Sequence, residues 1–206
     1  MHHIRALIQT YRPRLRTIAR HRRAISTMTT QGHFDRLDPS ILVEEETLRD
    51  YKAERFYPVR IGQLFKDRYR TIGKLGYGSA STVWLCRDLY SNKYIALKVY
   101  VNSSKLHREL EIYRHIHTLS SDHDGRRCIR ILLDSFEVDG PNGRHICLVH
   151  EPLGISFDEL RTLTAEGMFD EDLVRQTFRH VLTGLEFLHK EAHVIHTGKA
   201  IKLYAV

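Results

Sequence analysis

Three consecutive runs of branched and aromatic residues constrain the fold of this chain more than any other feature of its sequence. They are YRTIGKLGY at 69–77, STVWLCRDL at 81–89 and YIALKVYV at 94–101. β-Branched and aromatic residues favour strands, and the short gaps between the runs contain the small and polar residues that favour turns. The pattern predicts three strands that follow one another directly and pair in an antiparallel sheet.

The residues that follow predict a helix, two further strands and two more helices. Apolar side chains recur at helical spacing in KLHRELEIYRHIHTL, 105–119. The runs IRILLDSFEV and RHICLVH flank DGPNG, a turn signal whose glycine and asparagine residues can take positive φ. FDEL begins a short helix near Ser156, and a long helix is predicted over 171–191. The order βββ-α-ββ-α-α indicates an α+β fold with a five-stranded antiparallel sheet.

The charged residues are unevenly distributed along the chain. Seven of the 32 lysine and arginine residues lie in residues 1–34, which contain no acidic residue, and the remaining 25 match the 25 acidic residues. The net charge of +7 therefore belongs to this leader, and the near-neutral remainder argues against nucleic-acid binding. No apolar run reaches the ~20 residues that span a bilayer, which predicts no transmembrane segment. Cys86, Cys128 and Cys147 lack metal-site spacing and fit a reducing compartment.

The leader, residues 1–34, has two interpretations. Its apolar residues recur at helical spacing with arginines largely off that face, which is typical of a mitochondrial presequence. Pro13 would interrupt such a helix, and a disordered basic tail is the alternative. The acidic and polar residues 35–56 predict a linker.

The segment LGYGSASTV, 75–83, is the first candidate for binding chemistry. Gly76 and Gly78 let the backbone approach a ligand closely, and exposed N–H groups there can face phosphate oxygens. A G-x-G between strands is, on its own, more often part of an ordinary hairpin than of a ligand site.

Lys98 lies inside an apolar strand, where a charged side chain is unfavourable unless it has a partner. Glu109 on the following helix is the expected partner, because Ile112 and Tyr113 would then take buried positions; the rival Glu111 would place polar residues there. A strand lysine held by a helix glutamate can place its ammonium against two phosphates of a nucleotide. A snorkelling lysine beside a solvated glutamate is the alternative.

The third candidate is LVHEPLG, 148–154, where a strand runs into a connector. The carbonyl of Glu151 and the amide of Leu153 could contact the edge of an adenine, although the segment could also be a simple linker. Three apolar residues are expected to form the roof of an adenine slot: Leu75, Val83 and Ala96.

Together these motifs resemble the small lobe of a eukaryotic protein kinase. The stretch YPVRIGQLFKDRYRTIGKLGYGSASTVWLCRDL is similar to the SR-protein kinase (SRPK) family, in its lead-in and in Ser81, which fills the place of the third loop glycine. The resemblance runs from about Tyr57 to Thr197 and places His150 at the gatekeeper position. It implies an ATP site formed by Leu75, Gly76, Gly78, Ser81, Val83, Ala96, Lys98, Glu109, Glu151 and Leu153.

The resemblance also implies an activity: transfer of the γ-phosphate of ATP to serine or threonine of a Ser/Arg-rich protein, with Mg²⁺. In such kinases a loop of the form H-x-D-x-x-x-x-N follows the long helix. His196 and Thr197 fit its start, but Gly198 stands where the aspartate is expected, and no D-F-G or A-P-E follows. The sequence therefore predicts no catalytic residue, no magnesium ligand and an inactive, truncated chain. The alternative is a pseudokinase-like fragment that binds a nucleotide or a partner.

The expected organisation has five parts: a leader (1–34), a linker (35–56), a small lobe with hinge (57–154), part of a large lobe (155–197) and a tail unlike the family (198–206). Apolar residues cover more than one side of the helix at 171–191. Without the rest of a large lobe, this helix is expected to mediate self-association. The family implies a cytoplasmic or nuclear location, whereas the leader would fit a mitochondrial one.

Overall fold

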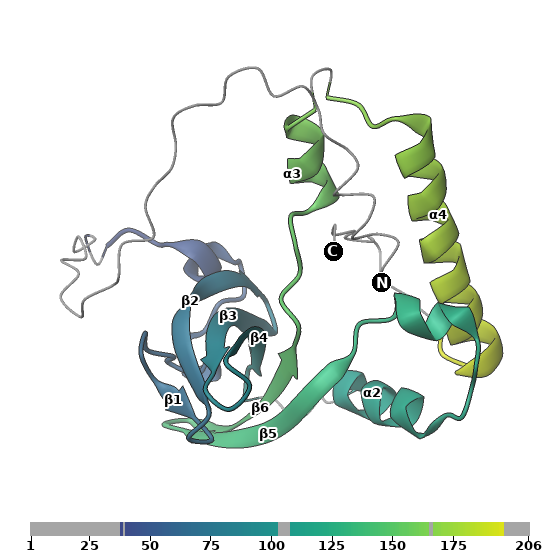
Figure 1. Ribbon diagram of the computed structural model, residues 1–206. Coiled ribbons are helices and arrows are strands. Elements are labelled where there is room, and N and C mark those ends of the chain that lie inside the picture. Colours follow the sequence, from purple (N-terminus) through teal and green to yellow (C-terminus); the bar gives the residue numbers. More distant parts are fainter. Residues whose placement is uncertain (1–37, 39, 103–107, 165–166, 196–206) are drawn as a thin grey trace. The chain divides into compact units, whose positions relative to one another are not determined.

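The computed structural model of the protein describes residues 38, 40–102, 108–164 and 167–195 (Figure 1). The leader, the start of the predicted catalytic loop and Gly198 lie outside these residues. Within the described part, a six-stranded antiparallel sheet has the order β1-β2-β3-β4-β6-β5.

Every run that predicts a strand forms one. The first three are β2 (Tyr69–Gly78), β3 (Ser81–Asp88) and β4 (Lys93–Tyr100). After one helix come β5 (Leu132–Gly140) and β6 (Gly143–His150), joined by the predicted turn. Before the sheet lie two single turns of 3₁₀-helix, η1 (Glu44–Thr47) and η2 (Ala53–Arg55).

A short strand at the sheet edge, β1 (Leu64–Phe65), is absent from the sequence prediction. Residues 66–68 connect it to β2. Lys66 and Asp67 have φ of 51° and 50°, and the amide of Arg68 donates to the carbonyl of Phe65 at 3.0 Å. Positive φ at both central residues is the geometry of a type I′ turn, which Asn-Gly usually forms and Lys-Asp does not signal. The prediction of five strands is therefore one strand short.

The two faces of the sheet pack against different elements. On one face Leu97 and Val99 belong to the main buried cluster, which also contains Phe65, Tyr69, Cys86, Ile95, Cys147 and Val149. Because side chains alternate along a strand, Lys98 lies on the opposite face. There Leu110, from the helix after β4, packs with Tyr100, Ile146 and Leu148.

That helix, α2 (Arg108–Thr118), corrects one expectation. Leu110 is buried and Tyr113 is half-buried against the sheet, but Ile112 is 39% exposed. Ile112 follows Leu110 by two positions, which is about 200° around a helix, so the two cannot share a face. The prediction that Ile112 is buried is wrong.

Two more helices follow β6, and their first turns have the expected capping residues. At α3 (Phe157–Thr162), Ser156 Oγ accepts from the Glu159 amide at 3.2 Å, and Glu159 accepts from the Ser156 amide at 3.0 Å. At α4 (Glu171–Glu186), Asp170 accepts from the amide of Leu173 at 2.7 Å.

The long helix predicted over 171–191 is not regular to its end. Its last five residues form a π-helical turn, η5 (Phe187–Glu191), closed by the Ala192 amide, which donates to the Phe187 carbonyl at 3.0 Å. Single π-turns of this kind frequently mark functional sites. None of the described helices is both long and apolar enough to cross a membrane.

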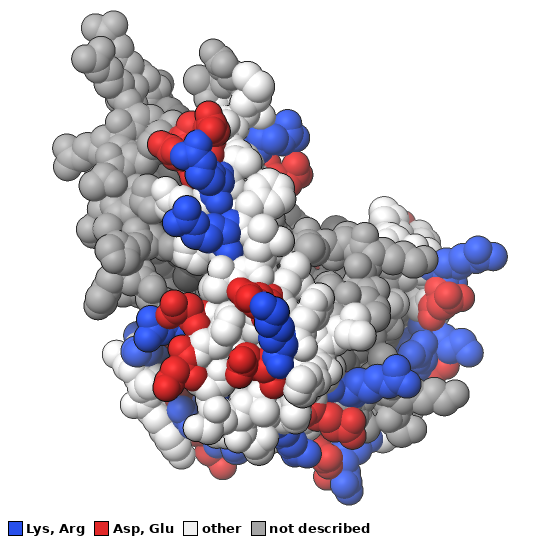
Figure 2. Space-filling model, turned by 90° about the vertical axis from the view of Figure 1, so that its right-hand side faces the viewer, with Lys and Arg blue, Asp and Glu red and all other residues white. Residues whose placement is uncertain are grey.

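Among the described residues, the helix α4 packs along one of its sides. Glycine allows a close approach to η4 (Asp124–Cys128): a Cβ on Gly125 would lie 2.1 Å from the Thr183 carbonyl oxygen, and one on Gly184 3.2 Å from Cys128 Cβ. Elsewhere along α4, Val174, Phe178 and Leu182 are exposed. On the face of the molecule shown in Figure 2, lysine and arginine residues are interspersed with aspartate and glutamate.

Candidate functional site

The Lys98 ammonium on β4 lies 2.6 Å from Glu109 Oε2 on α2. Both side chains keep access to solvent, with 25% of Lys98 and 36% of Glu109 exposed. Glu111, the rival acid, is exposed on the helix surface, away from this pair. Glu109 faces the sheet because it precedes half-buried Tyr113 by one helical turn.

Glu109 is held as a carboxylate by two partners. Tyr100, two residues after Lys98 on the same face of β4, also donates its hydroxyl hydrogen to Glu109 Oε2. Burial alone would raise the pKa of Glu109, but the charge of Lys98 and the hydrogen bonds from Lys98 and Tyr100 lower it below its ordinary value. Sequence analysis missed Tyr100, although its i+2 spacing from Lys98 was a readable signal.

The two glycines of the 75–83 segment lie within β2 rather than in a loop. Gly76 pairs with Val83 and Gly78 with Ser81, so the turn itself is Ser79–Ala80. Neither glycine has positive φ, and among the described residues a Cβ on either would meet nothing within 4 Å. Intramolecular packing therefore does not require glycine here, whereas a ligand close to the backbone would.

Two of the predicted roof residues, Val83 and Ala96, lie on the Lys98 face of the sheet. Val83 is directly opposite Lys98 in the β3–β4 ladder, and Ala96 is two residues before Lys98, so all three share one face. Ser81 is nearly buried opposite Tyr100. Leu75 is 53% exposed at a break in the β2–β3 register, where it can approach a ligand.

The predicted hinge follows β6 as an extended segment (Figure 1). The Glu151 carbonyl already accepts a hydrogen bond from Arg130 Nη2 at 2.9 Å, which leaves one lone pair for a ligand. The amide of Leu153 makes no hydrogen bond within the part of the chain that the structure describes. One acceptor and one donor are thus available where the sequence predicts contacts to an adenine edge.

His150 closes the inner end of this face. It lies opposite Ala96 in the β4–β6 ladder, its Nδ1 is 3.0 Å from the Ile131 carbonyl oxygen, and its ring centroid is 5.2 Å from that of Tyr113. Burial lowers the pKa of His150 to about 4, so the ring is neutral at pH 7. The Nδ1 position therefore carries the proton that is donated to Ile131.

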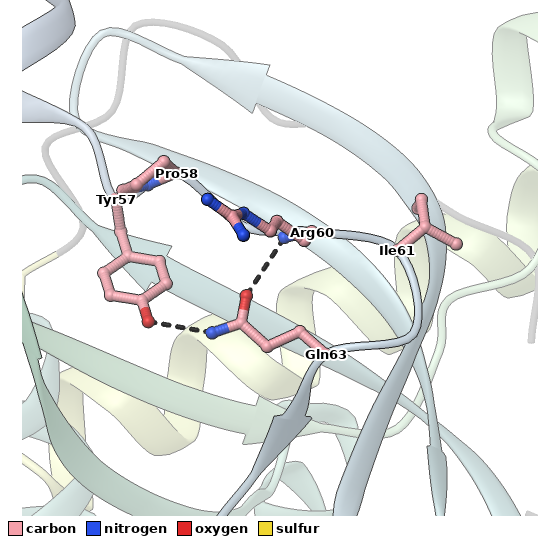
Figure 3. Close-up of a pocket in the computed structure, with 5 residues that line it drawn as sticks. All are labelled: Tyr57, Pro58, Arg60, Ile61 and Gln63. Atoms are coloured by element: carbon pink, nitrogen blue, oxygen red, sulfur yellow. Dashed lines mark hydrogen bonds between the residues drawn. The ribbon is translucent and has the colours of Figure 1, made fainter. Parts of the chain in front are cut away.

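A hollow in the described surface lies elsewhere, beside the segment that leads into β1. It has a volume of about 470 Å³ and is lined by Tyr57, Pro58, Arg60, Ile61 and Gln63 (Figure 3). Gln63 spans it, donating to the Tyr57 hydroxyl at 2.8 Å and accepting from the Arg60 amide at 3.0 Å. Tyr57 packs on the cluster that contains Leu97, so this hollow is separate from the Lys98 face. The described residues contain no group of three or more His, Cys, Asp or Glu that could hold a metal ion.

Comparison with known proteins agrees with this geometry. The protein kinase domain model matches residues 69–198. The chain belongs to the protein kinase family. Among its relatives are serine/threonine kinases of the SRPK type, to which the chain is similar in sequence.

The kinase chain is 40% identical over 170 residues to a serine/threonine protein kinase of Aspergillus fumigatus, covering 82% of this chain and 43% of that one. It is 37% identical over 157 residues to the serine/threonine-protein kinase SRPK of Physarum polycephalum, covering 75% and 37%. It is 33% identical over 158 residues to human SRSF protein kinase 3, covering 75% and 28%. The chain thus spans less than half the length of each of these relatives.

The fold comparison leads to the same family. The crystal structure of a kinase domain superposes with a TM-score of 0.53 at 26% identity, covering 66% of this chain and 39% of that chain. The sheet and α2 therefore correspond to a kinase small lobe, and α3 and α4 to the first helices of a large lobe. The predicted family and fold class are both confirmed.

Proposed function

We propose that the described residues form the ATP-binding part of an SRPK-type serine/threonine protein kinase. The observation that carries the proposal is the ion pair between Lys98 and Glu109, in which a solvent-accessible lysine is held at 2.6 Å by a carboxylate. Such a pair presents a fixed ammonium to the phosphates of a nucleotide. The open space at Gly76 and Gly78 supports it, because the backbone above the phosphates must come close to them.

The adenine would lie between the glycine-rich strands and the hinge. Leu75, Val83 and Ala96 would cover one side of the ring, and the Glu151 carbonyl and Leu153 amide would contact its edge. A kinase large lobe supplies the other side of this slot. We therefore expect the 206-residue polypeptide by itself to bind ATP weakly, with a Kd in the millimolar range, where binding contributes about 4 kcal/mol.

Phosphate transfer requires a group that Gly198 cannot supply. The family resemblance places at this position an aspartate that accepts the substrate hydroxyl proton, and glycine has no side chain to do so. General-base action accounts for about 10²–10⁴ in rate. We propose that a polypeptide of these 206 residues binds ATP without transferring its γ-phosphate to an Arg-Ser-repeat peptide. Labelled phosphate on the peptide above the level of a Lys98→Met variant would contradict this.

The binding proposal is tested by thermal unfolding of the full chain with increasing ATP. A ligand that binds only the folded state raises the unfolding temperature, and ATP at ten times its Kd stabilises by about 1.4 kcal/mol. We expect this rise for the unaltered chain and for Lys93→Met, an exposed lysine at the start of the same strand. The rise should be absent in Lys98→Met. An equal rise in Lys98→Met, or none in any protein, would refute the proposal.

A further inference from the structure

The segment before β1 contacts the sheet beside the glycine-rich hairpin. We define the hairpin as residues 75–83. Glu44 and Glu45, in η1, both place a carboxylate on the ammonium of Lys74, with Glu44 Oε2 at 2.5 Å. Lys74 is the residue directly before the hairpin. It pairs with Trp84, the neighbour of Val83, so it lies on the face of the sheet opposite Lys98.

Lys74 is enclosed rather than solvated. Only 17% of its side chain is exposed, and its ammonium lies 5.5 Å from the ring centroid of Trp84 and 5.7 Å from that of Tyr77. Burial by itself would lower the pKa of Lys74, but the two carboxylates raise it above its ordinary value, so the side chain is charged. We call this arrangement of Lys74 with Glu44 and Glu45 the latch.

The latch lies at the point where the side chains of β2 stop packing against the rest of the sheet. The β2–β3 register shifts between Lys74 and Gly76, and beyond that point Leu75 and Tyr77 are exposed. The glycine positions have open space around them among the described residues. Lys74 is therefore the last largely buried side chain of β2 before the hairpin tip.

The same segment is fastened at its other end. Asn102, just after β4, donates its amide hydrogen to the Arg55 carbonyl at 3.0 Å. Its side-chain amide donates to the Glu54 carbonyl at 3.0 Å and to the Asn142 carbonyl in the β5–β6 turn at 2.6 Å. Residues 44–56, which we call the strap, therefore connect the β2–β3 hairpin to the ends of β4 and β5 instead of serving only as a spacer.

We propose that Lys74 is a positioning residue for the glycine-rich hairpin, and that the strap holds the hairpin over the nucleotide through Glu44 and Glu45. The effect on nucleotide binding rests on the function proposed above, whereas the latch itself does not. Releasing the latch should loosen residues 75–83 while the core strands stay intact. It should weaken ATP binding although Lys74 lies on the face away from the nucleotide.

Hydrogen exchange in the full chain tests the latch without any ligand. In Lys74→Met and in Glu45→Gln we expect amides of residues 75–83 to exchange about two- to tenfold faster, with unchanged exchange in β6. The matched controls are Lys93→Met and Asp50→Asn, which remove the same charges from exposed positions in the same sheet and strap. Unchanged exchange at 75–83 in Lys74→Met, or an equal increase throughout the sheet, would overturn the inference.

A charge reversal separates the latch from a general loss of packing. Lys74→Glu should loosen the hairpin, and adding Glu44→Lys and Glu45→Lys should restore slow exchange. Trp84 is the single tryptophan of the chain, so its quenching by acrylamide reports the same change. Restored hairpin exchange supports an ionic latch, and a triple variant as loose as Lys74→Glu contradicts one.

Titration with ATP measures the consequence for binding. The Kd for ATP should rise about two- to tenfold in Lys74→Met and Glu45→Gln and stay unchanged in both controls. A hairpin that loosens without any change in a measurable Kd would overturn the positioning role. If the unaltered chain binds no ATP, the proposed function and the nucleotide part of this inference fail together, while the exchange data still decide whether the latch exists.

Discussion

Arg68 and Asp88 form a bidentate ion pair, in which Arg68 Nε and Nη2 each donate to a different carboxylate oxygen of Asp88 at 2.8 Å. The pair joins the turn after β1 to the end of β3. Asp88 is almost fully buried and also accepts from the amide of Tyr90 at 3.0 Å and the hydroxyl of Ser91 at 2.6 Å. Planar pairing of this kind fixes both side chains, so it fastens the edge of the sheet from which β2 begins.

Removing the arginine should destabilise the chain. Arg68→Met leaves the Asp88 carboxylate buried without its charge partner, which costs about 2–4 kcal/mol of unfolding free energy. The hydrogen bonds from Arg68 hold the pKa of Asp88 well below its usual range. The stabilisation is therefore present above about pH 4 and is lost as the pH falls further. Urea unfolding at pH 7 measures the loss, with Arg70→Met, an exposed neighbour on β2, as the control. Equal stability of the two variants would contradict the assignment.

His150 should make stability depend on pH in a defined window. Its pKa is lowered to about 4 by burial, whereas an unfolded histidine titrates near 6.5. The unfolded chain therefore binds a proton first, and stability falls as the pH drops from about 6.5 to about 4, by roughly 3 kcal/mol. The variant His150→Phe should remove this contribution, and His117→Gln, at an exposed position of α2, should keep it. Parallel stability curves for His150→Phe and the unaltered chain would refute the assignment.

The two glutamates of α2 should differ in their effect on ATP. Glu109→Gln removes the charge that holds Lys98, so the ATP-dependent rise in unfolding temperature should shrink or vanish. Glu111→Gln makes the same chemical change on the exposed face of the helix and should leave the rise unaltered. A calorimetric titration with ATP gives the two affinities directly. Equal loss in both variants would show that the pairing with Lys98 is not what matters.

The exposed apolar side of α4 should cause the 206-residue polypeptide to associate. Phe178 is 62% exposed, and Val174 and Leu182 lie one turn to either side of it. Sedimentation velocity should show an average mass that grows with concentration, and Phe178→Glu should reduce it. His180→Glu, on another side of the helix, serves as the control for the added charge. A monomer at every concentration would contradict the expected self-association.

Much of the fold could be predicted because local patterns and long-range pairing agree. The branched runs 69–77, 81–89 and 94–101 all become neighbouring strands, since each follows the last after a short turn. The strand β1 could not be found, because two residues show no periodicity and Lys66–Asp67 is not a usual hairpin pair. The regular helix predicted to Glu191 ends in a π-turn, which apolar spacing does not reveal.

In the candidate site too, local sequence patterns predicted some features and could not predict others. Glu109 could be chosen over Glu111 because helical spacing decides which residue faces the sheet, although the accompanying prediction for Ile112 was wrong. Contacts between segments far apart in sequence could not be predicted. The latch joins Glu44 and Glu45 to Lys74, about 30 positions apart, and composition alone made residues 35–56 look like a linker.

The central claim is that the Lys98 ammonium faces the phosphates of bound ATP, and one labelling measurement tests it most directly. An ATP analogue that carries an acyl group on its γ-phosphate acylates a nearby lysine: the amide bond forms, the acyl–phosphate bond breaks, and ATP leaves. Peptide mass spectrometry of the labelled chain should find the acyl group on Lys98 well above Lys93 and Lys74, and excess ATP should prevent it. Labelling of Lys98 no greater than that of Lys93, or unaffected by ATP, would contradict the account.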